Sequence, residues 1–340
     1  MYDLSRQRTR TLLEAARGAE IAVVGDVMLD RYFWGSVSRV SPEAPVPVVD
    51  IDNETFHLGG AANVAGNLLA LGARPLLCGV IGDDTSGRLL CQIAEDAGLD
   101  PSSFVVSEGR PTTVKTRVIG NNQQIVRLDR ETRSDVPDRV IERVVQHLGS
   151  REALRGIILE DYNKGFLSTE LITRVIALAN ERNIPVFVDP KRQNFFAYKG
   201  AYLVKPNRKE AQEALGYGLH SDADILRAGQ ELRNRLACTN VLITLGAAGM
   251  MLFEGNGDVS SVPTIAKKVA DVSGAGDTAI ATLAFMVAAG ASIREAAALA
   301  NVAAGIVVEE PGIVSITTST LLQAIADEDD VPASLQGEHR

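Results

Sequence analysis

The stretch Asp271-Val272-Ser273-Gly274-Ala275-Gly276-Asp277 stands directly before a run of small residues with a helical pattern, 278–289. Glycines at a loop-to-helix junction let backbone N–H groups converge, and the helix N-terminus adds a partial positive charge. The amides of Gly274, Ala275 and Gly276 would therefore stabilise charge on a transferred phosphoryl group. Asp277 would accept a proton from an attacking hydroxyl. A glycine-rich turn with Asp277 as an ordinary helix cap fits the same residues.

Short apolar segments and helical patterns alternate along the rest of the chain. Expected strands are 21–24, 76–81, 156–159, 186–189, 202–204 and 241–245, and expected helices are 61–71, 86–97 and 168–182. The strands are apolar throughout, which is typical of parallel strands covered by helices on both faces. The sequence therefore predicts a three-layer α/β/α fold with a central, mostly parallel sheet.

Two stretches depart from this rhythm. Residues 31–58 are rich in proline and lack a helical period, and residues 113–129 alternate around the turn-prone Gly120-Asn121-Asn122. The second stretch predicts a β-hairpin. We expect both to form a small β-sheet lid on a single domain of residues 1–330, followed by a polar tail, 331–340. A surface hairpin with no role at the site is the alternative.

Composition limits the partners of the chain. Hydrophobic residues make up 46% and charged residues 23%, and the formal net charge is −9. That charge argues against nucleic acid or an anionic membrane as a partner, although a local basic cluster can still bind a small anion. The N-terminus lacks an apolar signal core, so a cytoplasmic protein is expected. Cys78, Cys91 and Cys238 are predicted to be buried thiols, and the four widely spaced histidines argue against a zinc centre.

Two further motifs open expected helices. Gly59-Gly60 precedes Asn63, whose amide can both donate to and accept from sugar hydroxyls. Close packing of a helix against the sheet explains the same glycines. Asn207 and Glu210 follow the strand at 202–204, and they also fit a helix N-terminus with a capping box.

The order of these motifs resembles the ribokinase (PfkB) family of carbohydrate kinases over about residues 18–328. The matching patterns are Gly59-Gly60-x-x-Asn63-x-Ala65, Asn207-x-x-Glu210 and Asp271-x-x-Gly274-Ala275-Gly276-Asp277. Ser273 departs from the family's commonest signature, which has Thr there, but the hydroxyl is kept. The resemblance implies a ribokinase-like fold, ATP as cosubstrate, Mg²⁺, and a β-sheet lid that mediates dimerisation.

The resemblance also assigns roles to residues. Asp277 becomes the catalytic base, and the amides of Gly274, Ala275 and Gly276 form the anion hole. Asn207 and Glu210 would organise Mg²⁺ and the phosphates, with Glu210 reaching the metal through water. The expected sugar ligands are Gly59, Gly60, Asn63 and Asp30, which is expected to end the first strand region. The expected nucleotide ligands are Thr244, Gly246 and Asn301.

Four segments, 25–32, 38–48, 122–129 and 161–165, are similar to the heptose-7-phosphate kinase subfamily. This similarity implies phosphorylation of the anomeric (C1) hydroxyl of D-glycero-D-manno-heptose 7-phosphate. The product would be the β-1,7-bisphosphate used in ADP-heptose and lipopolysaccharide core synthesis. Some relatives carry a fused cytidylyltransferase-like domain with a His-x-Gly-His motif. The sequence lacks that motif, so we expect a stand-alone kinase.

Basic residues in or near these segments suit a phosphorylated sugar. The expected ligands are Arg117, Arg127, Lys164 and Lys191, together with Asp161 from the same segment as Lys164. Solvated surface charges are the alternative for each cation.

Other functions remain to be weighed. A dinucleotide-binding oxidoreductase needs Gly-x-Gly-x-x-Gly after the first strand, and residues 25–30 do not provide it. A non-catalytic sugar-binding protein on a kinase fold is a further alternative, which the intact Asp277 argues against. Among kinases, one for fructose phosphate or ribose is the second choice.

Overall fold

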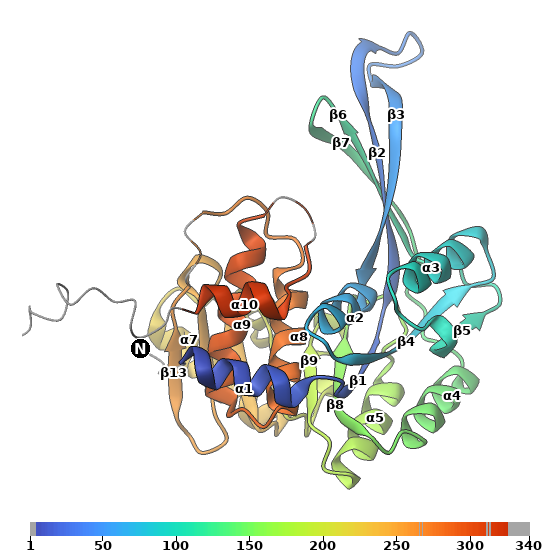
Figure 1. The fold of residues 1–340 in the computed structure, drawn as a ribbon. Helices are drawn as coiled ribbons and strands as arrows, with labels where there is room; N and C mark the ends of the chain where they lie inside the picture. Colours follow the sequence, from blue (N-terminus) through green and yellow to red (C-terminus); the bar gives the residue numbers. More distant parts are fainter. Residues whose placement is uncertain (1–4, 265, 267, 311, 313, 326–340) are drawn as a thin grey trace, which may run out of the picture.

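Two β-sheets organise the chain in the computed structural model, which describes residues 5–325 except 265, 267, 311 and 313. The predicted polar tail, 331–340, lies outside the described residues. The large sheet has the strand order β13-β12-β11-β10-β9-β8-β1-β4-β5, and the small sheet has the order β3-β2-β6-β7. Figure 1 shows the small sheet projecting from the body of the molecule. The predicted α/β architecture with a second small sheet is confirmed.

The large sheet is mostly parallel. Its strands are β1 (Glu20–Gly25), β4 (Arg74–Gly82), β5 (Phe104–Ser107), β8 (Leu154–Glu160), β9 (Val186–Asp189), β10 (Leu203–Val204), β11 (Asn240–Thr244), β12 (Met250–Phe253) and β13 (Val259–Val262). Neighbours from β5 to β11 run parallel, and the pairs β11–β12 and β12–β13 are antiparallel. The carboxyl ends of the parallel strands therefore meet at one edge, where ligands bind in such sheets.

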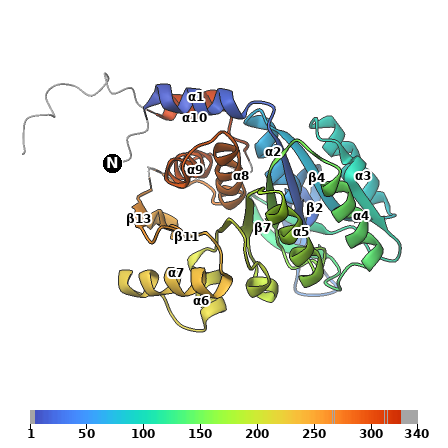
Figure 2. The same cartoon turned by 90° about the horizontal axis from the view of Figure 1, so that it is seen from below.

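Helices cover both faces of the large sheet, as Figure 2 shows. One layer contains α1 (Arg6–Ala16), α2 (Ala61–Ala70), α3 (Thr85–Asp96), α8 (Ala275–Ala288), α9 (Ile293–Val308) and α10 (Thr318–Ala324). The other contains α4 (Asp138–Gly149), α5 (Thr169–Glu181), α6 (Arg208–Leu215) and α7 (Asp222–Leu236). In β1, Ile21 and Val23 enter the first core, whereas Ala22 and Val24 enter the second. Two cores explain why the strand is apolar at every position from 21 to 24.

The small sheet grows directly out of the large one. Its strands are β2 (Val27–Val40), β3 (Pro47–Gly60), β6 (Val114–Gly120) and β7 (Gln123–Arg130). Only Asp26 separates β1 from β2, so Asp30 lies inside a long strand and does not end the first strand region as we expected. The predicted hairpin is confirmed, because β6 and β7 pair antiparallel. Asn121 and Asn122 connect them with φ values of 52° and 63°. A two-residue turn that matches the right-handed twist of the strands needs positive φ at both positions.

The three cysteines are free thiols, and Cys78 and Cys238 are buried as predicted, whereas Cys91 is half-buried. Burial raises the pKa of Cys78 and of Cys238 to about 12, so both behave as small apolar side chains. Within the described ranges of the chain, no helix has the length and apolar character needed to cross a bilayer.

Candidate active site

A cavity of about 590 Å³ opens beyond the carboxyl ends of β8, β9, β10 and β11. The predicted site residues that line it are Lys191, Asn207, Glu210, Thr244, Gly246, Gly274, Gly276 and Asp277. The fold thus brings together residues that lie far apart in the sequence, at 189–210, 244–246 and 272–277. A site for a phosphorylated ligand at this edge agrees with the general rule for open α/β sheets.

A second cavity, of about 240 Å³, adjoins the first and shares Thr244, Gly246 and Gly276 with it. Its walls are mainly apolar, and it also contains the predicted nucleotide ligand Asn301. The Asn301 amide donates to the carbonyl of Pro263 at 2.7 Å, which fixes the segment that borders this cavity. The two cavities together have a polar part and an apolar part, as a bound nucleotide requires.

Asp277 lies in the first turn of α8, which begins at Ala275 rather than at the predicted residue 278. The helix cap is Gly274, in the left-handed conformation with φ 79°, so Asp277 does not act as the cap. Its Oδ2 accepts from Nδ2 of Asn63 at 2.6 Å, and its Oδ1 accepts from the hydroxyl of Tyr162 at 3.0 Å. Burial raises the pKa of Asp277, although these two hydrogen bonds oppose the shift. A raised pKa suits a carboxylate that accepts a proton.

Helix α2 holds Asn63 in position against α8. The Thr278 hydroxyl donates to the Asn67 side chain at 3.0 Å, and Asn67 donates in turn to the carbonyl of Asn63. Gly60 opens α2 with φ +60°, and a Cβ there would lie 2.2 Å from the carbonyl oxygen of Asp26. Gly60 therefore lets the start of α2 pack closely against Asp26, and the same packing sets the position of Asn63.

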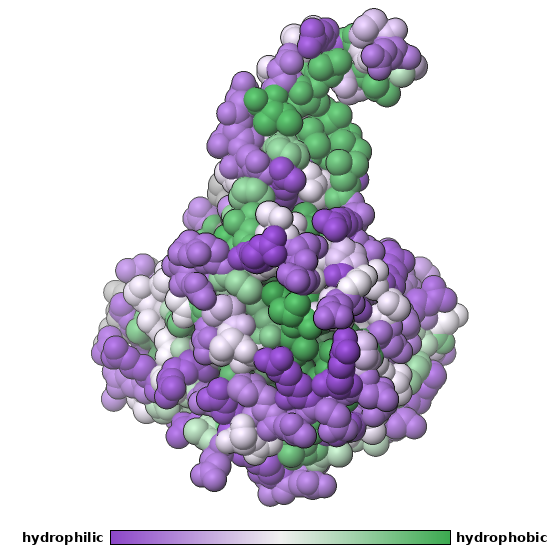
Figure 3. All heavy atoms as spheres, turned by 90° about the vertical axis from the view of Figure 1, so that its right-hand side faces the viewer, coloured by the Kyte–Doolittle hydropathy of each residue, from purple (hydrophilic) through white to green (hydrophobic). Residues whose placement is uncertain are grey.

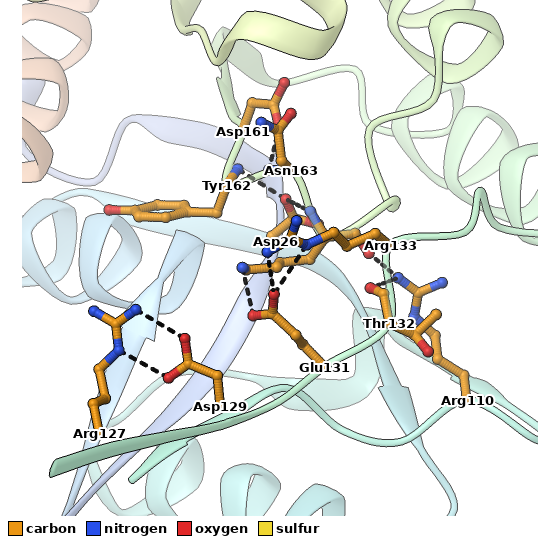
Figure 4. Close-up of polar contacts among 11 residues, drawn as sticks. Asp26, Arg110, Arg127, Asp129, Glu131, Thr132, Arg133, Asp161, Tyr162 and Asn163 are labelled. Atoms are coloured by element: carbon orange, nitrogen blue, oxygen red, sulfur yellow. Dashed lines mark hydrogen bonds and ion pairs between the residues drawn. The ribbon is translucent and has the colours of Figure 1, made fainter. Parts of the chain in front are cut away.

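Asp26 fixes the loop that carries Tyr162. Its buried carboxylate accepts from the backbone N–H group of Tyr162 at 2.8 Å (Figure 4). It also accepts from the backbone N–H groups of Lys164 and Phe166, at 3.0 and 3.3 Å. Burial and the neighbouring Asp161 raise the pKa of Asp26 to about 6, against the effect of these hydrogen bonds. Because three donors converge on one side chain, the loop after β8 has a defined path, and the Tyr162 hydroxyl reaches Asp277.

The buried acids are Glu160, Asp189 and Asp277, and they lie near the buried Lys205, beneath the glycine-containing segment 274–276. Lys205 Nζ lies 2.7 Å from Asp189 Oδ2, and both side chains are buried. Burial opposes ionisation of Asp189, but Lys205 and Lys191 outweigh it and lower its pKa. Glu160 is also buried, and neither of its oxygens has a hydrogen-bond partner among the residues that the structure describes. Burial raises the pKa of Glu160 well above its ordinary value, and the charges of Asp189 and Asp277 add to the shift.

Asn207 and Glu210 form the capping box that opens α6, so that alternative is confirmed. The Asn207 side chain accepts from the Glu210 backbone at 2.9 Å, and Glu210 Oε2 accepts from the Asn207 backbone at 2.8 Å. The other oxygen, Oε1, accepts a hydrogen bond from Lys191 Nζ. The motif shapes the cavity wall and also presents a carboxylate and an ammonium to the cavity.

The expected sugar ligands near the small sheet have partners within the protein. Asp30 pairs with Arg117, and Arg127 donates twice to Asp129, at 2.9 Å each (Figure 4). The Lys164 ammonium pairs with Glu131, and the Asp161 carboxylate accepts from the Tyr198 hydroxyl at 2.7 Å. A Cβ at Gly59 would lie 2.2 Å from Oδ2 of Asp30, so that glycine makes room for the Asp30–Arg117 pair.

Sequence reasoning did not assign roles to several site residues: Asp26, Glu160, Tyr162, Asp189 and Lys205. All except Tyr162 are polar residues at or directly after the carboxyl end of an apolar strand of the large sheet. That position was the signal that could have revealed them.

The described part of the chain contains no group of three or more His, Cys, Asp or Glu side chains that could hold a metal ion. Mg²⁺ in phosphoryl-transfer sites is bound mainly by phosphates and water, with one or two carboxylates. Glu210, which lines the large cavity, fits that limited role.

Comparison with known proteins agrees with this geometry. The chain belongs to the pfkB family of carbohydrate kinases, whose family model matches residues 19–320. It is 41% identical over 323 residues to the bifunctional protein HldE of Geobacter sulfurreducens, with 95% of this chain and 66% of the relative covered. It is 43% identical over 322 residues to HldE of Geobacter metallireducens, with 94% and 65% covered. The chain thus spans slightly less than two thirds of these relatives.

The fold has close structural neighbours as well. A ribokinase of Arabidopsis thaliana, solved with ribose and ATP, superimposes with a TM-score of 0.72 at 19% identity. The superposition covers 91% of this chain and 99% of the ribokinase chain. At this identity the likeness shows the fold, and the prediction of a ribokinase-like fold is confirmed. Family and fold together make the chain a sugar kinase.

The two buried acids should respond differently to loss of charge. Glu160→Gln should raise the free energy of unfolding relative to the wild type as pH increases, because burial keeps Glu160 protonated to a higher pH in the folded state than in the unfolded chain. In the wild type, unfolding releases that proton above about pH 4.3, so stability falls as pH rises toward the raised folded pKa. Asp189→Asn leaves the Lys205 ammonium buried without its partner and should cost about 3–5 kcal/mol. Urea unfolding between pH 5 and 8 measures both; equal losses in the two variants would contradict the assignment.

Proposed function

We propose that the chain transfers the γ-phosphoryl group of ATP to the anomeric hydroxyl of D-glycero-D-manno-heptose 7-phosphate, giving the β-1,7-bisphosphate for ADP-heptose and lipopolysaccharide core synthesis. The observation that carries the proposal is the Asp277 carboxylate, buried beside the large cavity and held by donors on both oxygens. The choice of sugar is supported by the four segments that resemble heptose-7-phosphate kinases. Three of them, 25–32, 38–48 and 122–129, lie in or next to strands of the small sheet.

In this mechanism Asp277 accepts the proton of the attacking hydroxyl as the new O–P bond forms. The bond between the γ-phosphorus and the bridging oxygen breaks, and ADP leaves. The first-turn amides of α8 and the helix dipole stabilise the charge on the transferred group. Asn63 and Tyr162 orient the carboxylate without neutralising it.

Mg²⁺ would supply charge neutralisation of the nucleotide phosphates. Glu210 would hold it through water, and Lys191 would place a further cation at the same cavity. We also propose that residues 31–58 and 113–129 act as a lid within one kinase unit, 1–330, and that the protein works in the cytoplasm, where ATP is available.

We further propose that the small sheet mediates a homodimer. Side chains alternate along β7, so Arg127 and Asp129 lie on one face while Val126 and Leu128 lie on the other. Val126 is 44% and Leu128 56% exposed, and Figure 3 shows apolar side chains gathered along the projecting sheet. Exposed apolar surface of this kind marks an interaction site.

The substrate is tested by ADP release with Mg·ATP across heptose 7-phosphate, fructose 6-phosphate, fructose 1-phosphate and ribose. Heptose 7-phosphate should have the highest kcat/KM, and NMR of the product should place the new phosphate on C1. Asp277→Asn, assayed in parallel, should lower kcat by about 10²–10⁴-fold because a positioned base is lost. Preference for another sugar would reject the heptose but keep the kinase; wild-type turnover by Asp277→Asn would reject the mechanism.

The dimer is tested by light scattering. Leu128→Lys places a charge in the proposed interface and should shift the protein from dimer to monomer at micromolar concentration. Val259→Lys is the matched control, because Val259 is a 37% exposed apolar residue on β13, away from the small sheet. A monomeric wild type, or a Leu128→Lys variant that remains dimeric, would contradict the proposal.

A further inference from the structure

Lys115 is a cation of the small sheet that the sequence did not single out. It lies on β6 directly opposite Asp30 of β2 and directly opposite Asp129 of β7. Residues that face each other across neighbouring strands project from the same side of the sheet. One face therefore carries the two carboxylates and three cations, because Arg117 and Arg127 occupy the next pair on that face.

The two arginines already use both carboxylates. Arg117 pairs with Asp30, and Arg127 pairs with Asp129. In the part of the chain that the structure describes, no carboxylate lies within ion-pair distance of Lys115 Nζ. The ammonium lies over the ring of Tyr162, 5.0 Å from the ring centroid. One positive charge on this face is thus left without a counter-charge.

The surroundings of Lys115 make that charge costly in the absence of an anion. Burial lowers the pKa of Lys115, and the neighbouring cations Lys164, Arg117 and Arg127 lower it further, while Asp30 opposes the shift. An anion at this place would relieve both effects at once, since it would compensate desolvation and separate the cations. A phosphate, with several oxygens and two negative charges, suits a group of clustered cations.

Tyr162 connects this position to the catalytic carboxylate. The Lys115 ammonium lies over its ring, and its hydroxyl donates to Asp277 Oδ1 at 3.0 Å. A substrate whose reacting hydroxyl lies at Asp277 and whose anion lies at Lys115 must therefore extend along a phenol ring. The reacting hydroxyl and the phosphate must stand at opposite ends of the sugar.

We propose that Lys115 is the residue that binds the phosphate of the acceptor and so selects sugars phosphorylated at the end remote from the reacting hydroxyl. This inference rests on the proposed function and deepens it. Arg117 and Arg127 act by occupying the two carboxylates of the face, which keeps Lys115 available. Lys115 holds the substrate and takes no part in the proton transfer at Asp277.

The test compares the wild type with Lys115→Met and Lys115→Arg on heptose 7-phosphate and on unphosphorylated heptose. Lys115→Met should raise KM for heptose 7-phosphate by about 10- to 100-fold, the effect of a lost hydrogen bond between charged groups, and should leave kcat within about threefold. KM for unphosphorylated heptose should not change, and Lys115→Arg should recover most of the loss. Lys199→Met is the matched control, because Lys199 is an exposed lysine that lies outside the small sheet.

Calorimetric titration without ATP separates this inference from the proposed function. Heptose 7-phosphate, fructose 6-phosphate and ribose 5-phosphate are each compared with the unphosphorylated sugar. If wild type fails to phosphorylate heptose 7-phosphate but binds another of these phosphates better than its sugar, the proposed function fails. Loss of that preference in Lys115→Met alone would still support the inference. An unchanged preference in Lys115→Met, or no preference in the wild type, would overturn it.

Discussion

The hydrogen bonds to Asp277 are the constraint on which the rest of the site depends. A carboxylate that must accept a proton cannot be paired tightly with a cation, because the ion pair would lower its pKa. In this structure the amide of Asn63 and the hydroxyl of Tyr162 hold the two oxygens instead. The nearby Lys205 is paired with Asp189. The base is therefore fixed in direction while burial keeps its pKa raised.

Each of those two donors is positioned by a different part of the fold, and both parts meet at Asp26. The Asp26 carboxylate holds the loop of Tyr162, and its carbonyl accepts from the first amide of α2, the helix that carries Asn63. Asp26 is also the residue at which the chain leaves the large sheet and enters the small one. Asp26 thus connects the catalytic base, the glycine pair and the proposed lid. A side chain at Gly60 would collide with the Asp26 carbonyl oxygen, which explains the glycine there.

Much of this could be predicted from local patterns. Continuous apolar strands indicated a sheet covered on both faces, and Gly120-Asn121-Asn122 indicated the hairpin. The roles of Asp26, Tyr162 and Lys115 could not be predicted, because each depends on contacts between residues distant in sequence. Tyr162 lies 115 positions from Asp277, and Asn63 lies 214 positions from it. Asp30 was misplaced because a single residue, Asp26, separates two strands of different sheets. The sequence predicted Arg117, Arg127 and Lys164 as ligands of a phosphorylated sugar. It did not predict that each of them pairs with a carboxylate of the protein.

The most direct test of the central claim is the pH dependence of kcat/KM in wild type and Tyr162→Phe. Removing the hydroxyl takes a donor from the ionised form of Asp277, so the acid limb of the profile should move to higher pH by about one unit. At pH values above that limb, kcat should fall by no more than about tenfold, since Asn63 still orients the carboxylate. An acid limb at the same pH in both enzymes would show that the controlling ionisation is not that of Asp277, and the account of the site would be wrong.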